Sequence, residues 1–182
     1  MRVSNLSDFA GELDSNTPYG LRQLFATVTI TPELATMVNI FNLANATANS
    51  LLRRNTTNLS FDVLYEPLPV STLTQGDGAA ANSLGLNEAD GNLIVVLLDI
   101  MWSSSRDDNA IHSAVRQMFA QIKAQSTSGV VNDFIYFNYA GLFQNPVHGY
   151  GTPMVKSLQA ASKKYDPKQM FQKQVPGGFK LF

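Results

Sequence analysis

The sequence predicts an α+β fold in which residues 1–182 form a single domain around an antiparallel or mixed β-sheet, with helices packed on one face. Two patterns lead to this prediction. Four segments rich in β-branched and aromatic residues have the length and the bounds of strands. Between them, apolar residues recur every three or four positions, as they do on one face of a helix. A hydrophobic content of 45% suits one core of this size. The helix-free sheet face would then be open to line a pocket or an interface.

The first half of the chain supplies two of these strands and one helix. Residues 24–31 read LFATVTIT and are expected to form a strand. Thr31 is expected to cap the helix that follows, which carries Pro32 in its first turn and ends near residue 54. Apolar and polar residues alternate over 59–65, which predicts a second strand that stops at the prolines of 67–69.

The second half opens with a loop over 71–90, where Gly, Ala, Asn and Ser are frequent. Residues 92–102 are apolar on both faces except at Asp99, as expected for a central strand that is covered on both sides. Three further elements are expected: a helix over 107–126, a strand over 130–139, and a helix that begins at Pro153.

Composition excludes several classes of function. The formal net charge is −1 with no basic run, so nucleic acid is not an expected partner. The chain has no cysteine and two histidines without ligand spacing, so no metal site is expected. The longest apolar run, 93–98, is too short to span a membrane. Residues 1–13 lack the apolar stretch of a signal peptide, which predicts a cytoplasmic protein.

Four groups of motifs follow one another along nearly the whole chain. They are Pro-Leu-Pro at 67–69; Asn-Ser-Leu-Gly-Leu at 82–86 with Ala-Asp-Gly at 89–91 and the strand that ends at Trp102; Tyr-Phe-Asn-Tyr-Ala at 136–140 with Gln-Asn-Pro at 144–146 and Tyr-Gly at 150–151; and the tail segments 162–167, 171–172 and 176–181. In this order and spacing, the chain resembles the C-terminal, substrate-binding half of fungal FAD-linked oxidases of the berberine-bridge-like group.

That resemblance implies an antiparallel sheet whose open face looks onto the flavin, and oxidation of a small molecule by hydride transfer to FAD. The flavin-binding half of such enzymes precedes this region. The present sequence has no G-x-G-x-x-G motif, and the Gly-Asp-Gly at 76–78 is not followed by a convincing helix. We therefore expect no bound cofactor, and FAD only if a separate flavin-binding half supplies it.

Tyr139 is the best candidate for a catalytic residue, because the resemblance places a tyrosine of this motif beside the flavin, as a base or a substrate contact. A tyrosine is a plausible base only if its neighbours lower its pKa. Asn138 and Tyr136 are candidate substrate contacts. On a strand, however, Tyr136 and Asn138 would face away from Tyr139 unless the strand ended or bulged at Asn138. The alternative is structural: a half-buried tyrosine and a strand-end amide.

Two acidic residues are further catalytic candidates. Glu66 stands at the end of the second strand, where many members of that group have an amide. Asp99 is the one charge in an apolar strand, and a buried carboxylate needs a partner or a raised pKa. The alternative for Asp99 is an ion pair with a neighbouring strand or helix.

Three other residues are candidate substrate contacts. Tyr65 and Trp102 have rings that could stack on a planar substrate, although packing in the core is the alternative for both. His148 lies in a predicted loop, where a solvated side chain is the alternative to an acid–base role.

Three functions remain open from the sequence. The first is a flavin-free enzyme that folds a small natural-product precursor for a cyclisation, an isomerisation or a pericyclic step. An initiator methionine and a complete C-terminal tail favour such a stand-alone product. The second is a fragment or subunit of an FAD-dependent oxidoreductase, and the third a binding module without activity. A homodimer is expected, because the open sheet face and the apolar tail at Phe179, Leu181 and Phe182 need cover.

Overall fold

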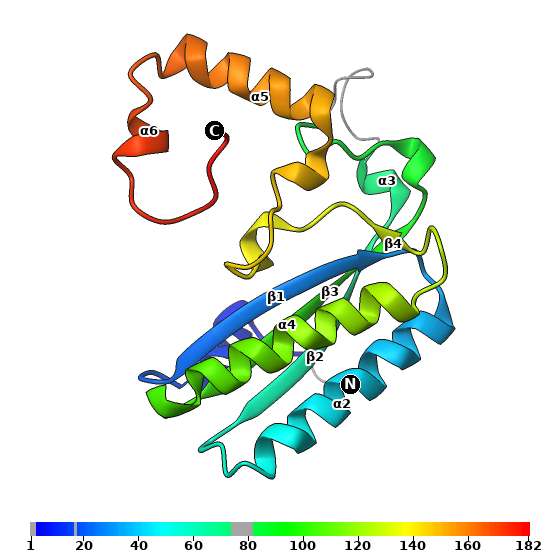
Figure 1. Ribbon diagram of the computed structural model, residues 1–182, viewed down its shortest axis with the longest axis vertical. Helices are drawn as coiled ribbons and strands as arrows, with labels where there is room; N and C mark the ends of the chain where they lie inside the picture. The colour runs from blue at the N-terminus through cyan, green and yellow to red at the C-terminus, as the bar shows by residue number, and fades with distance from the viewer. Residues whose placement is uncertain (1–2, 17, 74–81) are drawn as a thin grey trace.

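A computed structural model, which describes residues 3–16, 18–73 and 82–182, shows the α+β class that the sequence predicts. Its sheet is antiparallel throughout, with the strand order β2-β3-β1-β4 (Figure 1). The four strands are β1 (Arg22–Ile30), β2 (Ser60–Leu68), β3 (Leu93–Trp102) and β4 (Val131–Asn132). The apolar strand β3 is central, as expected, and pairs along its length with β1 on one side and β2 on the other.

Two long helices, α2 (Leu34–Leu52) and α4 (Asp108–Gln125), pack against each other on one face of the sheet. Each helix connects two strands that run in the same direction with a third strand between them, so the topology consists of two interleaved split β-α-β units. The remaining helices are α1 (Leu6–Asn16), α3 (Val70–Leu73), α5 (Thr152–Tyr165) and α6 (Met170–Lys173). Helices α5 and α6 extend beyond the end of the sheet where β4 lies (Figure 1).

The main core lies between the sheet and the α2–α4 pair. Alternate residues of β3 point toward the helices, and their cross-strand partners in β1 and β2 do the same. The β3 residues of this core, together with those of α4, are Val96, Leu98, Ile100, Trp102, Ile111, Val115, Met118 and Ile122. Every one of these side chains is at most 1% exposed. The apolar residues that recur at helical spacing in this part of the sequence therefore form the buried face of α4.

The helix-free face is less open than the sequence suggests. A second cluster of buried residues covers the end of the sheet near β4 and consists of Leu73, Leu86, Leu93, Val95 and Phe134. Near the other end, residues of α1 line a cavity together with β2 and β3. Helix α1 was not anticipated, because its apolar side chains lie largely on the surface: Leu6 is 84% exposed and Leu13 69%. The face thus carries separate cavities instead of one open surface.

The predicted fourth strand is wrong over most of its length. Residues 130–139 are rich in β-branched and aromatic residues, but only Val131–Asn132 pair with β1. The Asn132 side chain then accepts a hydrogen bond from the backbone N–H of Phe134, which turns the chain out of the sheet. Farther along, residues 137–139 form a 3₁₀ turn.

Two predicted boundaries also differ. Thr31 does not cap α2: its backbone N–H donates to the carbonyl of Val130, and Glu33 is the N-cap residue instead. Strand β2 continues through Pro67 to Leu68. A proline is tolerated there because β2 is an edge strand, whose outer side needs no ladder hydrogen bond.

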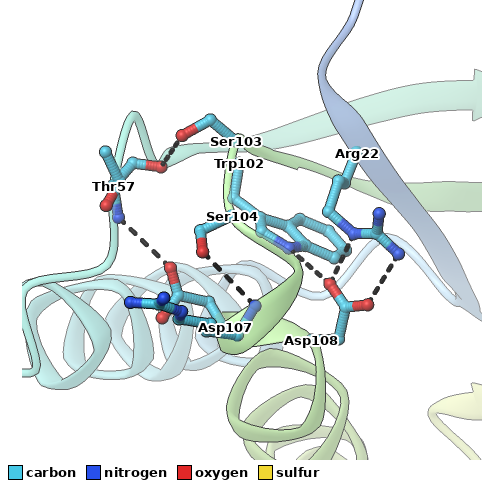
Figure 2. A network of polar contacts seen from close by, with 8 residues as sticks. Arg22, Thr57, Trp102, Ser103, Ser104, Asp107 and Asp108 are labelled. Carbon is cyan, nitrogen blue, oxygen red and sulfur yellow. Dashed lines mark hydrogen bonds and ion pairs between the residues drawn. The ribbon is translucent and has the colours of Figure 1, made fainter.

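A polar network ties the start of α4 to the sheet (Figure 2). The Arg22 guanidinium donates to both carboxylate oxygens of Asp108, at 2.5 and 2.6 Å. The Trp102 indole N–H donates to the same carboxylate at 2.8 Å. These hydrogen bonds hold the pKa of Asp108 below its ordinary value, with Arg22 as the main cause. The first turn of α4 is therefore fixed to the start of β1 and the end of β3.

Among the described residues, no helix is both long and apolar enough to cross a membrane. The Gly-Asp-Gly at 76–78 and much of the predicted 71–90 loop lie outside the described residues.

Candidate functional site

A cavity of about 310 Å³ lies on the helix-free face, at the end of β2. This volume is at the lower end of the range for small-molecule pockets, about 300–1,000 Å³. Glu66 is the one charged residue in its described lining, which is otherwise mainly apolar and aromatic. The lining comprises Glu66, Pro67, Leu68, Thr72, Leu73, Asn82, Leu84, Val95, Phe134, Tyr136 and Tyr139.

Three residues predicted from the sequence meet in this cavity, which we call the Glu66 pocket. The Tyr139 hydroxyl donates a hydrogen bond to Oε1 of Glu66 at 3.2 Å. The rings of Tyr136 and Tyr139 meet edge to face, with centroids 4.8 Å apart and planes at 84°. Because the strand ends early and residues 137–139 form a 3₁₀ turn, side chains three positions apart come to one side. The conflict posed by strand alternation is thereby resolved.

Asn138 lies at the rim of this arrangement. Its side-chain amide donates to the Tyr136 hydroxyl at 3.1 Å, and the residue is exposed. It is absent from the described lining of the Glu66 pocket. In this structure Asn138 therefore orients Tyr136 and does not line the cavity itself.

The electrostatics of Tyr139 favour a hydrogen-bond donor. Burial raises the pKa of its hydroxyl above the ordinary value of 10.0, and the nearby Glu66 carboxylate raises it further. The condition for a tyrosine base, a lowered pKa, is not met. The hydroxyl keeps its proton and directs it at Glu66, so the pocket presents a paired carboxylate and phenol to a ligand.

One wall of the pocket depends on a close approach of two loops. Gly85 has φ +77°, in the region that favours glycine, and a Cβ there would lie 2.1 Å from the carbonyl oxygen of Tyr150. The Asn82 side chain closes the same turn by bonding the backbone of Leu84 and Leu86. Gly85 thus lets the 82–86 segment bring Asn82 and Leu84 to the pocket.

Two aromatic candidates lie on the other side of the sheet. Tyr65 precedes Glu66 in β2 and faces α2, where its hydroxyl donates to the carbonyl of Met37 at 2.8 Å. Trp102 is 1% exposed, lies in the main core and donates to Asp108 (Figure 2). The structure does not bring either residue into the Glu66 pocket. Both side chains instead pack on the side of the sheet that faces the helices.

Asp99 and His148 border separate cavities. Asp99 lies opposite Asp62 across the β2–β3 ladder and lines an open cavity of about 820 Å³ beside α1. Burial raises the pKa of Asp99, and the Asp62 charge adds to that effect. His148 is exposed and lines a cavity of about 460 Å³ at the start of α5.

Sequence reasoning missed the apolar walls of the Glu66 pocket. Phe134 was assigned to a strand, and Thr72 and Leu73 to a loop. Leu84 was available as part of the 82–86 motif, but nothing in a single sequence shows that this loop reaches Glu66. The contact is long-range in sequence, so no local pattern carries it.

The Glu66 pocket has the volume for one small molecule. No three potential metal ligands among His, Cys, Asp and Glu gather anywhere in the part of the chain that the structure describes. The residues of the Glu66 pocket offer hydrogen bonds and aromatic contacts to a ligand.

Comparison with known proteins gives similarity over the whole chain. It is 35% identical over 185 residues to the FAD-dependent monooxygenase CTB5 of Cercospora nicotianae, covering 100% of this chain and 39% of that protein. It is 32% identical over 184 residues to the FAD-dependent monooxygenase elcE of Phaeosphaeria nodorum, covering 100% of this chain and 51% of elcE. The bifunctional solanapyrone synthase of Alternaria solani is 33% identical over 121 residues, or 66% of this chain and 24% of the synthase.

No protein-family model and no solved structure matches the sequence. The chain spans about half the length of the curated relatives it matches, or less. The relatives that carry the similarity over all 182 residues are named as flavin-dependent. The chain is therefore a partial relative of fungal FAD-dependent monooxygenases.

Proposed function

We propose that these residues form the substrate-binding part of an FAD-dependent oxidoreductase of fungal secondary metabolism. The observation that carries this proposal is the Glu66–Tyr139 hydrogen bond inside a largely apolar pocket. Pockets of this kind use a few polar groups to orient a ligand that apolar walls otherwise hold. The similarity to flavin-dependent enzymes supports the reaction class. The finer resemblance to the berberine-bridge-like group is part of the same proposal.

The pocket suits a small, flat and mainly apolar substrate that carries a hydroxyl group. The substrate would lie against the edges of Tyr136 and Tyr139, with its hydroxyl within reach of Glu66. The Glu66 carboxylate would accept the hydroxyl proton, while Tyr139 donates a hydrogen bond that orients the carboxylate. The raised pKa of Tyr139 keeps the phenol protonated for this role. FAD would be supplied by polypeptide other than these 182 residues.

The flavin-free cyclisation, isomerisation or pericyclic step considered from the sequence is the less favoured function. The same pocket would serve it, but the relatives with full coverage of the chain are named as FAD-dependent. The experiment below separates the two functions, because only the oxidoreductase needs flavin.

The test is a chimaera in which this chain replaces the matching 185 residues of the Cercospora nicotianae relative. Its oxidation of that relative's substrate is measured with FAD bound, beside the variants Glu66→Gln and Tyr65→Phe. We expect flavin-dependent turnover that Glu66→Gln lowers about ten- to hundredfold and Tyr65→Phe leaves unchanged. Turnover by the isolated chain without flavin would overturn the proposal, and so would full activity of the Glu66→Gln chimaera.

We also propose that the isolated chain forms a homodimer. Large apolar side chains stand on its surface, among them Leu6 of α1 and Phe171 of α6, at 84% and 70% exposure. Twofold pairing is the commonest way to cover such groups.

A further inference from the structure

A second apolar cavity lies on the edge of the sheet, away from the Glu66 pocket. It has a volume of about 360 Å³ and is bounded by β1, by α4 and by residues 131–135 and 143–144. Its floor is closed by Gln144, whose amide donates to the Thr27 carbonyl at 2.7 Å and accepts from the Thr27 N–H at 3.0 Å. That side chain replaces a neighbouring strand, so the floor presents little unpaired backbone to a ligand.

One face of α4 forms a wall of this cavity. Arg116, Phe119, Ala120 and Lys123 are spaced at i, i+3, i+4 and i+7 and all line it. The face therefore carries an apolar centre with a cation at each end. Asp133 is the one acidic residue in the described lining. The charges that border the cavity thus favour a single negative charge.

Arg116 is held in place by an aromatic pair. Its guanidinium lies 5.1 Å from the centre of the Phe143 ring, and that ring meets Phe119 edge to face at 5.6 Å. Neither Arg116 nor Lys123 forms an ion pair within the described part of the chain. Both cations are consequently available to an anion, next to a surface of two phenyl rings.

We propose that this cavity, the α4 pocket, binds a small aromatic carboxylate. The ring system would lie against Phe119, Phe143 and Ala120, and the carboxylate would pair with Arg116 at one end, while Lys123 at the other end adds a longer-range attraction. Arginine suits this role, because its planar group can hold a carboxylate with two hydrogen bonds while it stacks on an aromatic ring. The proposal does not depend on the oxidoreductase function, since no residue of the Glu66 pocket takes part.

The test uses 2-naphthoate as the probe and neutral 2-naphthylmethanol as its matched control. Both are titrated into the ¹⁵N-labelled chain, and amide chemical shifts give the site and the dissociation constant. We expect shifts at residues 116–123 and 131–144 with 2-naphthoate, and at least about tenfold weaker binding of the alcohol. Arg116→Gln and Lys123→Gln should each weaken 2-naphthoate binding about threefold, and the double variant about tenfold.

Two further variants make the result decisive. Ala120→Leu keeps every charge but fills the apolar centre, so it should weaken the probe and the alcohol alike. Lys168→Gln removes an exposed cation of the tail and should leave binding unchanged. Equal binding of acid and alcohol, undiminished binding by the double variant, or shifts confined to another region would each overturn the proposal. Melting temperatures confirm that the variants fold.

Discussion

Tyr65 and Tyr139 carry the same hydroxyl group on opposite faces of one sheet. Tyr65 faces α2 and bonds the carbonyl of Met37, whereas Tyr139 reaches Glu66, the next residue along β2. Strand alternation predicts that Tyr65 and Glu66 point apart. It cannot tell which face lines a pocket, because that depends on where the 131–139 segment returns. The sequence therefore predicted Glu66 and Tyr139 as separate candidates, and the tertiary structure brings them into contact.

The first prediction separates these two hydroxyls in the chimaera. Tyr139→Phe removes the donor to Glu66 and should lower turnover about ten- to hundredfold, the loss of roughly 1–3 kcal/mol in the transition state. Tyr65→Phe is the matched control and should cost about 1 kcal/mol of folding stability without changing turnover. Turnover and melting temperature are measured for each. An unchanged rate for Tyr139→Phe would remove this residue from the site.

Asp99 is under strain from burial and from a like charge. Its Oδ1 is buried without a hydrogen-bond partner in the described structure, and Asp62 lies directly opposite on β2. Its pKa is raised, so the folded state binds the proton more tightly than the unfolded state does. Between the unfolded and the folded pKa, stability therefore falls as the pH rises.

The second prediction follows from that sign. Asp99→Asn should stabilise the fold at pH 7 by about 0.2–1 kcal/mol, the size of a cross-strand like-charge effect. The gain should shrink as the pH falls below the folded pKa, where Asp99 is itself neutral. Urea unfolding at pH 7 and at pH 4 measures both values. A loss of stability at pH 7 would show that the charged form of Asp99 is stabilised by its surroundings.

At the scale of elements, buried periodicity was predictable and sheet edges were not. The apolar run of β3 and the stripe of α4 predict their own positions, because each faces the core along its whole length. Residues 130–139 have a strand composition too, but beside Thr27 of β1 the Gln144 side chain, and not a strand, bonds the backbone. A side-chain amide that imitates a strand leaves no periodic signal. The predicted N-cap of α2 at Thr31 was also wrong: Glu33 is the N-cap residue, and the Thr31 backbone N–H donates to the Val130 carbonyl.

The third prediction tests this edge. Gln144→Ala should destabilise the fold by about 1–3 kcal/mol, because it leaves the Thr27 backbone groups without their partner. Hydrogen exchange at the Thr27 amide should also become faster. Gln117→Ala, an exposed change on α4, is the control and should alter neither quantity by much. Unchanged protection of Thr27 would mean that another group, or water, holds this edge equally well.

At the scale of the whole molecule, the chain combines a well-covered core with a poorly covered periphery. The sheet and the α2–α4 pair enclose nearly all fully buried side chains. Helices α1, α5 and α6 bury none of the residues that the structure describes in them. Part of the C-terminal tail contacts the rest of the chain. Phe179 packs on Phe137, and the Gln159 side-chain amide donates to the Leu181 carbonyl. Composition predicts one core but not how much apolar surface remains outside it.

The last prediction is that the isolated chain self-associates through this periphery. Leu6 and Phe171 are 84% and 70% exposed, and pairing of two copies would remove such large apolar side chains from water. Light scattering after size exclusion should give about twice the mass of 19.9 kDa at micromolar concentrations. Phe171→Ser should shift the molecule toward the monomer if the tail forms the interface, and Leu6→Ser should do so if α1 forms it. Both sites are exposed, so the unfolding free energy of the monomer should stay within about 0.5 kcal/mol of that of the original chain. A monomeric mass at every accessible concentration would show that the polar residues around these side chains are sufficient to keep the surface soluble.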